Sequence, residues 1–206
     1  IYGMDNYPIF NEKSDMQVLA NALDAAHKVF GFNGTLSCWA VPQIFAWNSY
    51  NKSYPFYFPK EEEMRATLIL MSLSGVKGFV MYIFETIFDA EKPGDDAEIR
   101  WKAICNNAQM LRDLEPYLLS DFPAEKLKPE QRQGEVRATA FKAENGSRAV
   151  LIASINADPA EAGIKIDNPG EFVSRYGRSK LDGNGVWIFR GKGIDGDVLI
   201  REEKRK

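Results

Sequence analysis

Glu85 has the clearest capacity for acid–base chemistry, because it directly follows the apolar segment Phe79–Phe84 (FVMYIF). A carboxyl group that emerges at the end of a buried strand is half desolvated, which tends to raise its pKa and is common at catalytic sites. Hydrolysis of a glycosidic bond uses two carboxyl groups, one protonated and one ionised. We therefore predict a catalytic role for Glu85. The alternative is a carboxylate at the rim of the fold, paired with a lysine or arginine.

A second source of chemistry is the loop WNSYNKSYPFYFP (47–59), in which aromatic residues stand among asparagines and serines. The aromatic residues are Trp47, Tyr50, Tyr54, Phe56, Tyr57 and Phe58. Flat aromatic faces suit the apolar C–H patches of sugars, while amides and hydroxyls bind sugar hydroxyls. The loop therefore predicts a carbohydrate-binding surface. Packing of the loop onto the fold is the alternative, and it is favoured for Phe56 and Phe58.

Short apolar runs alternate with amphipathic helices from residue 1 to about 120, which predicts a parallel sheet. Strands are expected at 1–4, 35–41 and 77–84, and helices at about 15–30, 60–73 and 96–118. Functional residues gather where such strands end, because the loops there converge on one side. The predicted substrate-binding residues are Asp5, Tyr7, Trp39, Gln43, Trp47, Tyr50 and Tyr82. For Asp5, a cap of its own loop is the alternative role.

The pattern divides the chain into two domains joined by a linker. Residues 1–121 hold about three βα units, less than half of the roughly 250 residues that a TIM barrel takes. Residues 122–134 contain prolines and charged residues and are expected as the linker. Residues 135–206 read as short strands separated by turn signals such as Asn145-Gly146, which predicts an antiparallel β-sandwich. The expected fold class is therefore α/β plus all-β, with part of a (β/α)8 barrel before a sandwich.

Three segments, and the order in which they follow one another, indicate a family: DNYP (5–8), WAVPQIFAW (39–47) and YPFYFPKEEEMRATLILMSLSGVKGFVMYIFE (54–85). Together they resemble the last part of a glycoside hydrolase barrel of the β-galactosidase-like clan. The resemblance implies strands six to eight of the barrel followed by a β-sandwich. It places six residues at the catalytic centre: Asp5, Tyr7, Trp39, Gln43, Tyr82 and Glu85. The sequence departs from the clan in having no carboxylate within 35–47, where the nucleophile belongs. It also lacks strand four, which supplies the acid/base residue.

Composition excludes several other classes. The 206 residues are 45% hydrophobic and 27% charged, with a net charge of -3, which is ordinary for a globular protein. Basic and acidic residues are balanced, so no nucleic-acid-binding surface is expected. No apolar run is long enough for a membrane helix. His27 is the only histidine and no glycine-rich phosphate loop follows a strand. We therefore expect no cofactor and no metal.

The leading hypothesis is a glycoside hydrolase-like protein acting on O-glycosidic bonds, present here as a C-terminal fragment. Its expected partners are an oligosaccharide or polysaccharide substrate and the missing N-terminal half of the barrel. A non-catalytic carbohydrate-binding or scaffolding protein with a degenerate barrel is the alternative, and a fragment without any ligand is a third. The sequence leaves the compartment open; degradation of a polysaccharide would favour an extracytoplasmic location.

Overall fold

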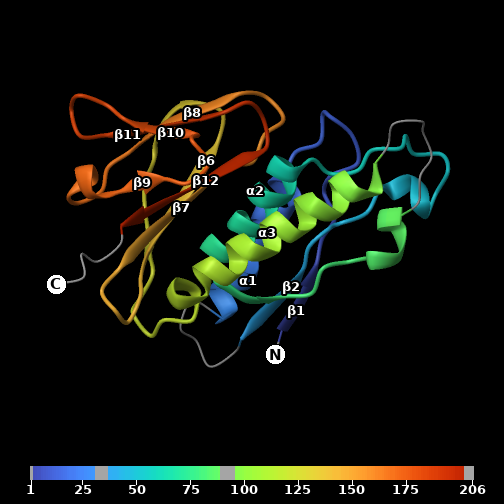
Figure 1. Ribbon diagram of the computed structural model, residues 1–206, viewed down its shortest axis with the longest axis horizontal. Coiled ribbons are helices and arrows are strands. Elements are labelled where there is room, and N and C mark those ends of the chain that lie inside the picture. The colour runs from blue at the N-terminus through green and yellow to red at the C-terminus, as the bar shows by residue number, and fades with distance from the viewer. Residues whose placement is uncertain (1, 31–36, 89–95, 202–206) are drawn as a thin grey trace.

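The computed structural model describes residues 2–30, 37–88 and 96–201. Within them, three α-helices lie between a parallel sheet and the first of two antiparallel sheets (Figure 1). The α-helices are α1 (Gln17–Phe30), α2 (Glu61–Leu73) and α3 (Ala97–Leu118). The short 3-10 helices are η1 (Trp47–Ser49), η2 (Phe84–Phe88) and η3 (Pro169–Glu171).

The parallel sheet has the order β1-β2-β3, with β1 at Tyr2–Asp5, β2 at Cys38–Val41 and β3 at Val76–Phe79. The strand predicted at 77–84 ends early, but the chain beyond it stays beside β2. The N–H of Val80 donates to the carbonyl of Ala40 at 2.9 Å, and the N–H of Tyr82 donates to the carbonyl of Pro42 at 3.1 Å. The peptide bond between Tyr82 and Ile83 is cis. Parts of the predicted first and second strands, residues 1 and 35–36, lie outside the described residues.

Two antiparallel sheets follow and face one another across an apolar core that includes Ile152, Trp187, Phe189 and Leu199. The five-stranded sheet runs β4 (Glu125–Lys126), β6 (Val136–Lys142), β7 (Arg148–Ser154), β12 (Asp195–Arg201) and β9 (Val173–Ser174). The four-stranded sheet runs β10 (Ser179–Leu181), β11 (Trp187–Gly191), β8 (Ala160–Ile164) and β5 (Glu130–Gln133). Strands β4 and β5 lie within 122–134, where the sequence predicts a linker.

The prediction of part of a TIM barrel is wrong. The described residues form a mixed α/β fold with only three α-helices, and most of its strands belong to the antiparallel sheets. A barrel helix packs on the outside of a strand ring and leaves one face in solvent, whereas Glu63 through Leu73 of α2 are all buried. This helix contacts β3 on one side and β7 and β12 on the other. The apolar residues that suggested a barrel helix therefore fill the interior between two sheets.

Local signals determine where α2 begins and ends. Three glutamates occupy its first turn, where carboxylates favour the positive end of the helix dipole, and Glu63 accepts a hydrogen bond from the Lys60 N–H at 2.8 Å. After the helix, Gly75 has a φ of 101°, a conformation that favours glycine. The helix is thereby fixed between the loop of residues 47–59 and the start of β3.

A buried ion pair joins the helix layer to the five-stranded sheet. Arg65 of α2 contacts the Asp195 carboxylate of β12 at 2.6 Å and donates to the carbonyl of Gly196 at 3.0 Å. Arg178 contacts the second oxygen of Asp195, also at 2.6 Å. Because breaking one partner of such a buried pair leaves an uncompensated charge, this contact holds α2 and β12 in one register.

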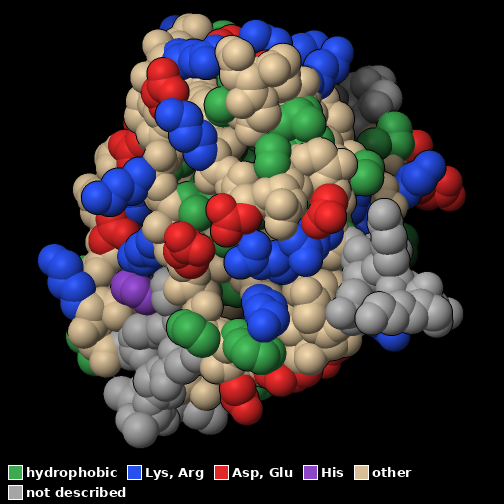
Figure 2. Space-filling model, turned by 90° about the vertical axis from the view of Figure 1, so that its left-hand side faces the viewer, with side chains coloured by type: hydrophobic (Ala, Val, Ile, Leu, Met, Phe, Trp, Pro, Cys, Tyr) green, Lys and Arg blue, Asp and Glu red, His purple; other side chains and the backbone are tan. Residues whose placement is uncertain are grey.

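Charged side chains of both signs cover the end of the molecule that the antiparallel sheets form. Figure 2 shows lysine, arginine, aspartate and glutamate side chains interspersed there with small groups of hydrophobic side chains. Opposite charges on this end also pair directly, as Arg190 does with Glu161 at 2.7 Å. The segments that contain η1 and η2 lie at the other end of the molecule (Figure 1).

Candidate functional site

Six aromatic residues gather beyond the carboxyl ends of the parallel strands, and we call them the aromatic cluster: Tyr7, Phe45, Trp47, Tyr50, Tyr54 and Tyr82. Tyr82 lies in the middle of a row of three tyrosine rings. It stacks on Tyr7 with ring centroids 5.7 Å apart and on Tyr50 with centroids 6.5 Å apart. The three rings come from segments far apart in the sequence, which converge because the three strands are parallel and adjacent.

Phe45 forms the floor beneath these rings. It is fully buried, and its ring meets Tyr7, Tyr50 and Tyr82 edge-on at centroid distances of 5.1, 5.0 and 5.9 Å. Edge-to-face contacts of this kind are favourable because the positive ring edge meets the negative ring face. Sequence reasoning missed Phe45, since a phenylalanine inside the apolar segment 39–47 carries no signal that separates a site floor from an ordinary core residue.

Trp47 forms one side of the cluster and is held in place by its polar edge. Its indole N–H donates to the carbonyl of Tyr7 at 3.3 Å, and its ring centroid lies 5.9 Å from that of Tyr54. The side chain of Asn48, which is buried, donates to the carbonyl of Tyr54 at 2.8 Å and folds the loop back on itself. The loop therefore presents Tyr50 and Tyr54 at the surface, where both rings are more than two-fifths exposed.

Gln43 does not line the surface that the sequence assigned to it. The side chain is buried, and its amide contacts only main-chain groups in the described structure. It donates to the carbonyls of Ile9 and Phe45 at 2.6 and 3.0 Å, and it accepts from the N–H of Ile9 at 3.1 Å. Gln43 therefore ties the loop after β1 to the loop after β2 and acts on Tyr7 and Phe45 only through the backbone.

The charges of two carboxylates, Asp5 and Glu85, contribute to the pKa values of tyrosines in the row. Burial and the charge of Asp5 raise the pKa of Tyr7. Partial burial, a hydrogen bond with Tyr82 and, more weakly, the charge of Glu85 raise the pKa of Tyr50. A tyrosine with an ordinary pKa of about 10 is already protonated at neutral pH, so both phenols are neutral there, and the Tyr50 hydroxyl is engaged with Tyr82.

Glu85 lies in η2 and is exposed, rather than half-buried at the end of a strand. The chain stays hydrogen-bonded beside the β2 segment up to Tyr82 and then enters η2, so Glu85 sits on a separate short helix. Beside it, the exposed rings of Phe84, Phe88 and Trp101 form a second group, with centroids 5.4 and 5.6 Å from Phe84. Glu85 is therefore solvated and bordered by aromatic surface.

Trp39 is the predicted site residue that lies farthest from the cluster along its strand. It stands on β2, four residues before Gln43, and its side chain is 45% exposed. The structure thus brings together Tyr7, Trp47, Tyr50 and Tyr82. Asp5 contributes to the pKa of Tyr7, and Glu85 contributes to the pKa of Tyr50. It places Gln43 beneath the surface and Trp39 farther along the sheet.

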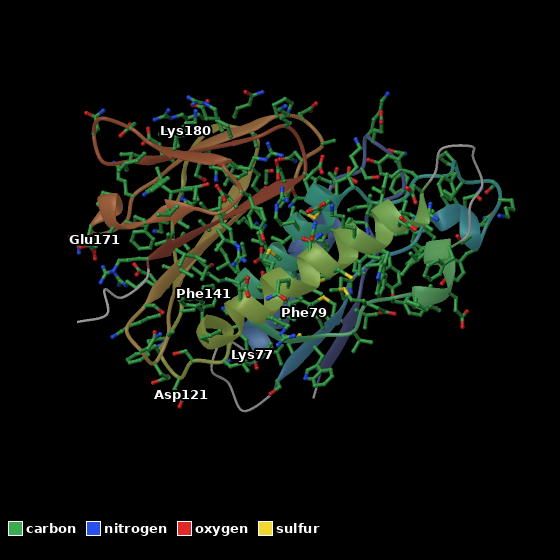
Figure 3. The ribbon with its side chains drawn as sticks, viewed as in Figure 1. Lys77, Phe79, Asp121, Phe141, Glu171 and Lys180 are labelled. Atoms are coloured by element: carbon green, nitrogen blue, oxygen red, sulfur yellow. The ribbon has the colours of Figure 1, made fainter. Side chains whose placement is uncertain are left out.

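A surface cavity of about 760 Å³ lies elsewhere, between α3 and strands β9 and β12. Its walls include two ion pairs, Arg175 with Asp113 and Glu171 with Arg201. Figure 3 shows Glu171 at the antiparallel end of the molecule, far from Phe79 of β3. The carboxylates that line the cavity, Asp113 and Glu171, are therefore both paired with arginines.

The described residues contain no group of three or more histidine, cysteine, aspartate or glutamate side chains arranged to hold a metal ion. Within the same ranges, no helix combines the length and the apolarity that crossing a bilayer requires. No protein-family model matches the chain, and no curated protein matches it.

Proposed function

We propose that this protein binds a carbohydrate at the aromatic cluster. The observation that carries the proposal is the row of three stacked tyrosines beside Trp47, with the exposed rings of Tyr50 and Tyr54 at its surface. The exposed ring surfaces cover apolar C–H faces of a sugar, and phenol oxygens bind its hydroxyls. Asp5 and Glu85 accept hydrogen bonds from the same hydroxyls. Phe45, locked beneath the row, keeps the platform rigid, so little ordering is left to oppose binding.

Calorimetric titration with a panel of oligosaccharides tests this proposal. Tyr82→Ala removes the ring that touches both neighbouring tyrosines, so we expect affinity to fall about tenfold or more, which corresponds to about 1.4 kcal/mol. Tyr82→Phe keeps the stacking surface and should lose less. The matched control is Phe122→Ala, which removes an exposed ring next to Lys142, outside the aromatic cluster. If no oligosaccharide binds, or if Tyr82→Ala binds as the unmodified protein does, the cluster is not a sugar site.

Hydrolysis of an O-glycosidic bond is the second function that we propose for this site. The observation that favours it is that the charge of Asp5 helps to raise the pKa of Tyr7 and the charge of Glu85 helps to raise that of Tyr50, while both rings stack on Tyr82. In this proposal, a sugar on the row is within reach of one carboxylate from β1 and one from η2. That is the pair of groups that glycoside hydrolysis uses.

Turnover of aryl glycosides separates hydrolysis from binding. In Glu85→Gln, we expect turnover to fall about a hundredfold, as when one acid–base group is lost, while affinity changes little. Glu115→Gln, an exposed glutamate on α3, is the control and should keep full turnover. Unchanged turnover in Glu85→Gln, or no turnover by the unmodified protein, would rule out this catalytic role and leave the binding proposal standing.

A further inference from the structure

Among the residues that the structure describes, no helix packs against one face of the parallel sheet, and we call it the open face. Alternation along the strands places Met4, Cys38, Ala40 and Val76 on the opposite side, where they are buried against the helices. The residues of the open face are Gly3, Asp5, Trp39, Val41, Gly78 and Val80. Continuing the same alternation by two residues leads from Asp5 to Tyr7 and from Val80 to Tyr82. On β1 and β3 the open face therefore leads toward the aromatic cluster, whereas on β2 the next position in the alternation, Gln43, is buried.

Trp39 lies flat on this face because both of its neighbours across the strands are glycines. It pairs with Gly3 on β1 and with Gly78 on β3. A Cβ atom added to Gly78 would lie 2.9, 2.9 and 3.0 Å from three atoms of the Trp39 indole. Nearly equal distances to three ring atoms mean that the ring covers Gly78 face-on. One face of the indole thus rests on the backbone of β3, while the side chain remains 45% exposed.

Resting on the proposed function, we infer that Trp39 on Gly78 is a second stacking platform and that the ligand is an oligosaccharide extended along the open face. Gln43, which pairs with Tyr82 just beyond the end of β2, lies four positions after Trp39 along the chain. At about 3.3 Å per residue, the platform lies about 13 Å from the tyrosine row. That separation exceeds a single sugar ring, so a ligand must contain several linked sugars to contact both.

The surface between the two platforms suits a sugar chain better than an apolar partner. Asp5 is exposed there and offers carboxylate oxygens to hydroxyls, and Val80, half exposed, provides an apolar strip beside it. Gly3 leaves open space, since a Cβ added to it would meet nothing within 4 Å. Apolar patches that alternate with hydrogen-bond acceptors match the two kinds of surface that a sugar ring presents.

A series of oligosaccharides of increasing length tests the second platform. For the unmodified protein, we expect affinity to rise once the ligand is long enough to reach Trp39. Gly78→Ala pushes the indole off β3, because its methyl group would overlap the ring, and Trp39→Ala removes the ring. Both variants should lose about tenfold in affinity for the long ligands and keep the affinity for the short ones. Gly3→Ala is the matched control, since it adds a methyl group to the same face in open space.

The outcomes distinguish this inference from the proposed function. If short oligosaccharides bind at the aromatic cluster but affinity does not rise with length, the second platform is refuted and the proposed function stands. Equal affinity for long ligands in Trp39→Ala and the unmodified protein refutes it as well. If light scattering reveals a dimer that Trp39→Ala abolishes, a second copy covers the open face and the inference fails. Absence of any oligosaccharide binding overturns both.

Discussion

At the scale of single residues, the aromatic cluster depends on an amide that never reaches the surface. Gln43 uses both ends of its side chain on the main chain of Ile9 and Phe45, and it is almost fully buried. Ile9 lies two residues after Tyr7, and the Phe45 ring packs edge-on against the Tyr7 ring with centroids 5.1 Å apart. Gln43 therefore helps to position Tyr7 through the main chain of Ile9, in addition to the hydrogen bond that the Tyr7 carbonyl accepts from the Trp47 indole.

Replacing Gln43 by leucine should destabilise the protein. The N–H and carbonyl of Ile9 would lose their partner inside the core, which costs about 1–3 kcal/mol of unfolding free energy for an unsatisfied group. Urea unfolding measures this loss, and oligosaccharide affinity should fall with it as Tyr7 shifts. Gln109→Leu, on the exposed face of α3, is the control, with an expected change within about 0.5 kcal/mol. Equal stability of Gln43→Leu and the unmodified protein would mean that this amide does not organise the site.

At the scale of elements, helix limits could be predicted because their causes are local. The Asp96 carboxylate accepts from the N–H of Glu98 at 2.8 Å and starts α3 where the sequence places it, and Asp15 accepts from the N–H of Gln17 at the start of α1. Ser14, one residue before Asp15, instead accepts from the N–H groups of Phe10 and Asn11. A cap needs only a few residues to act, so one sequence suffices to find it.

Pairings that depend on distant segments could not be predicted in the same way. Strands β4 and β5 consist entirely of exposed residues and carry no apolar alternation, so only their partners β6 and β8 make them strands. A barrel was expected from the strand–helix alternation of residues 1–121 and from the family resemblance, and the apolar surface of α2 indicated burial but not which sheets would cover it. For the site, the ends of parallel strands correctly indicated where Tyr7, Trp47, Tyr50 and Tyr82 meet. The burial of the Gln43 side chain depends on its hydrogen bonds to Ile9, and no pattern near Gln43 in the sequence predicts it.

At the scale of the whole molecule, two titratable groups at the junctions between layers respond to pH in opposite directions. His27 of α1 lies 3.0 Å from the carbonyl of Ser74, and burial, together with the nearby charge of Lys126, lowers its pKa. Glu63 of α2 accepts from the Tyr57 hydroxyl at 2.7 Å, yet burial raises the pKa of its carboxyl group. The folded state therefore disfavours the charged form of both side chains.

The signs follow from proton binding. Between the lowered pKa of folded His27 and its ordinary value near 6.5, the unfolded chain binds more protons, so the free energy of unfolding falls as pH falls. Just above the ordinary pKa of a glutamate, the folded state binds more protons at Glu63, so the free energy of unfolding rises as pH falls. As pH falls from about 7, protonation of His27 should thus first lower the free energy of unfolding, and protonation of Glu63 should then raise it again in part.

Variants at the two positions should change the slope of stability against pH in opposite ways. His27→Gln, which can still donate to Ser74, should flatten the loss of unfolding free energy between about pH 7 and pH 5. Glu63→Gln should remove the compensating gain and make the loss steeper. Denaturant unfolding at a series of pH values reads this slope, which is independent of the constant cost of each substitution. Because His27 is the only histidine in the chain, a slope that His27→Gln leaves unchanged would assign the pH response to carboxylates alone.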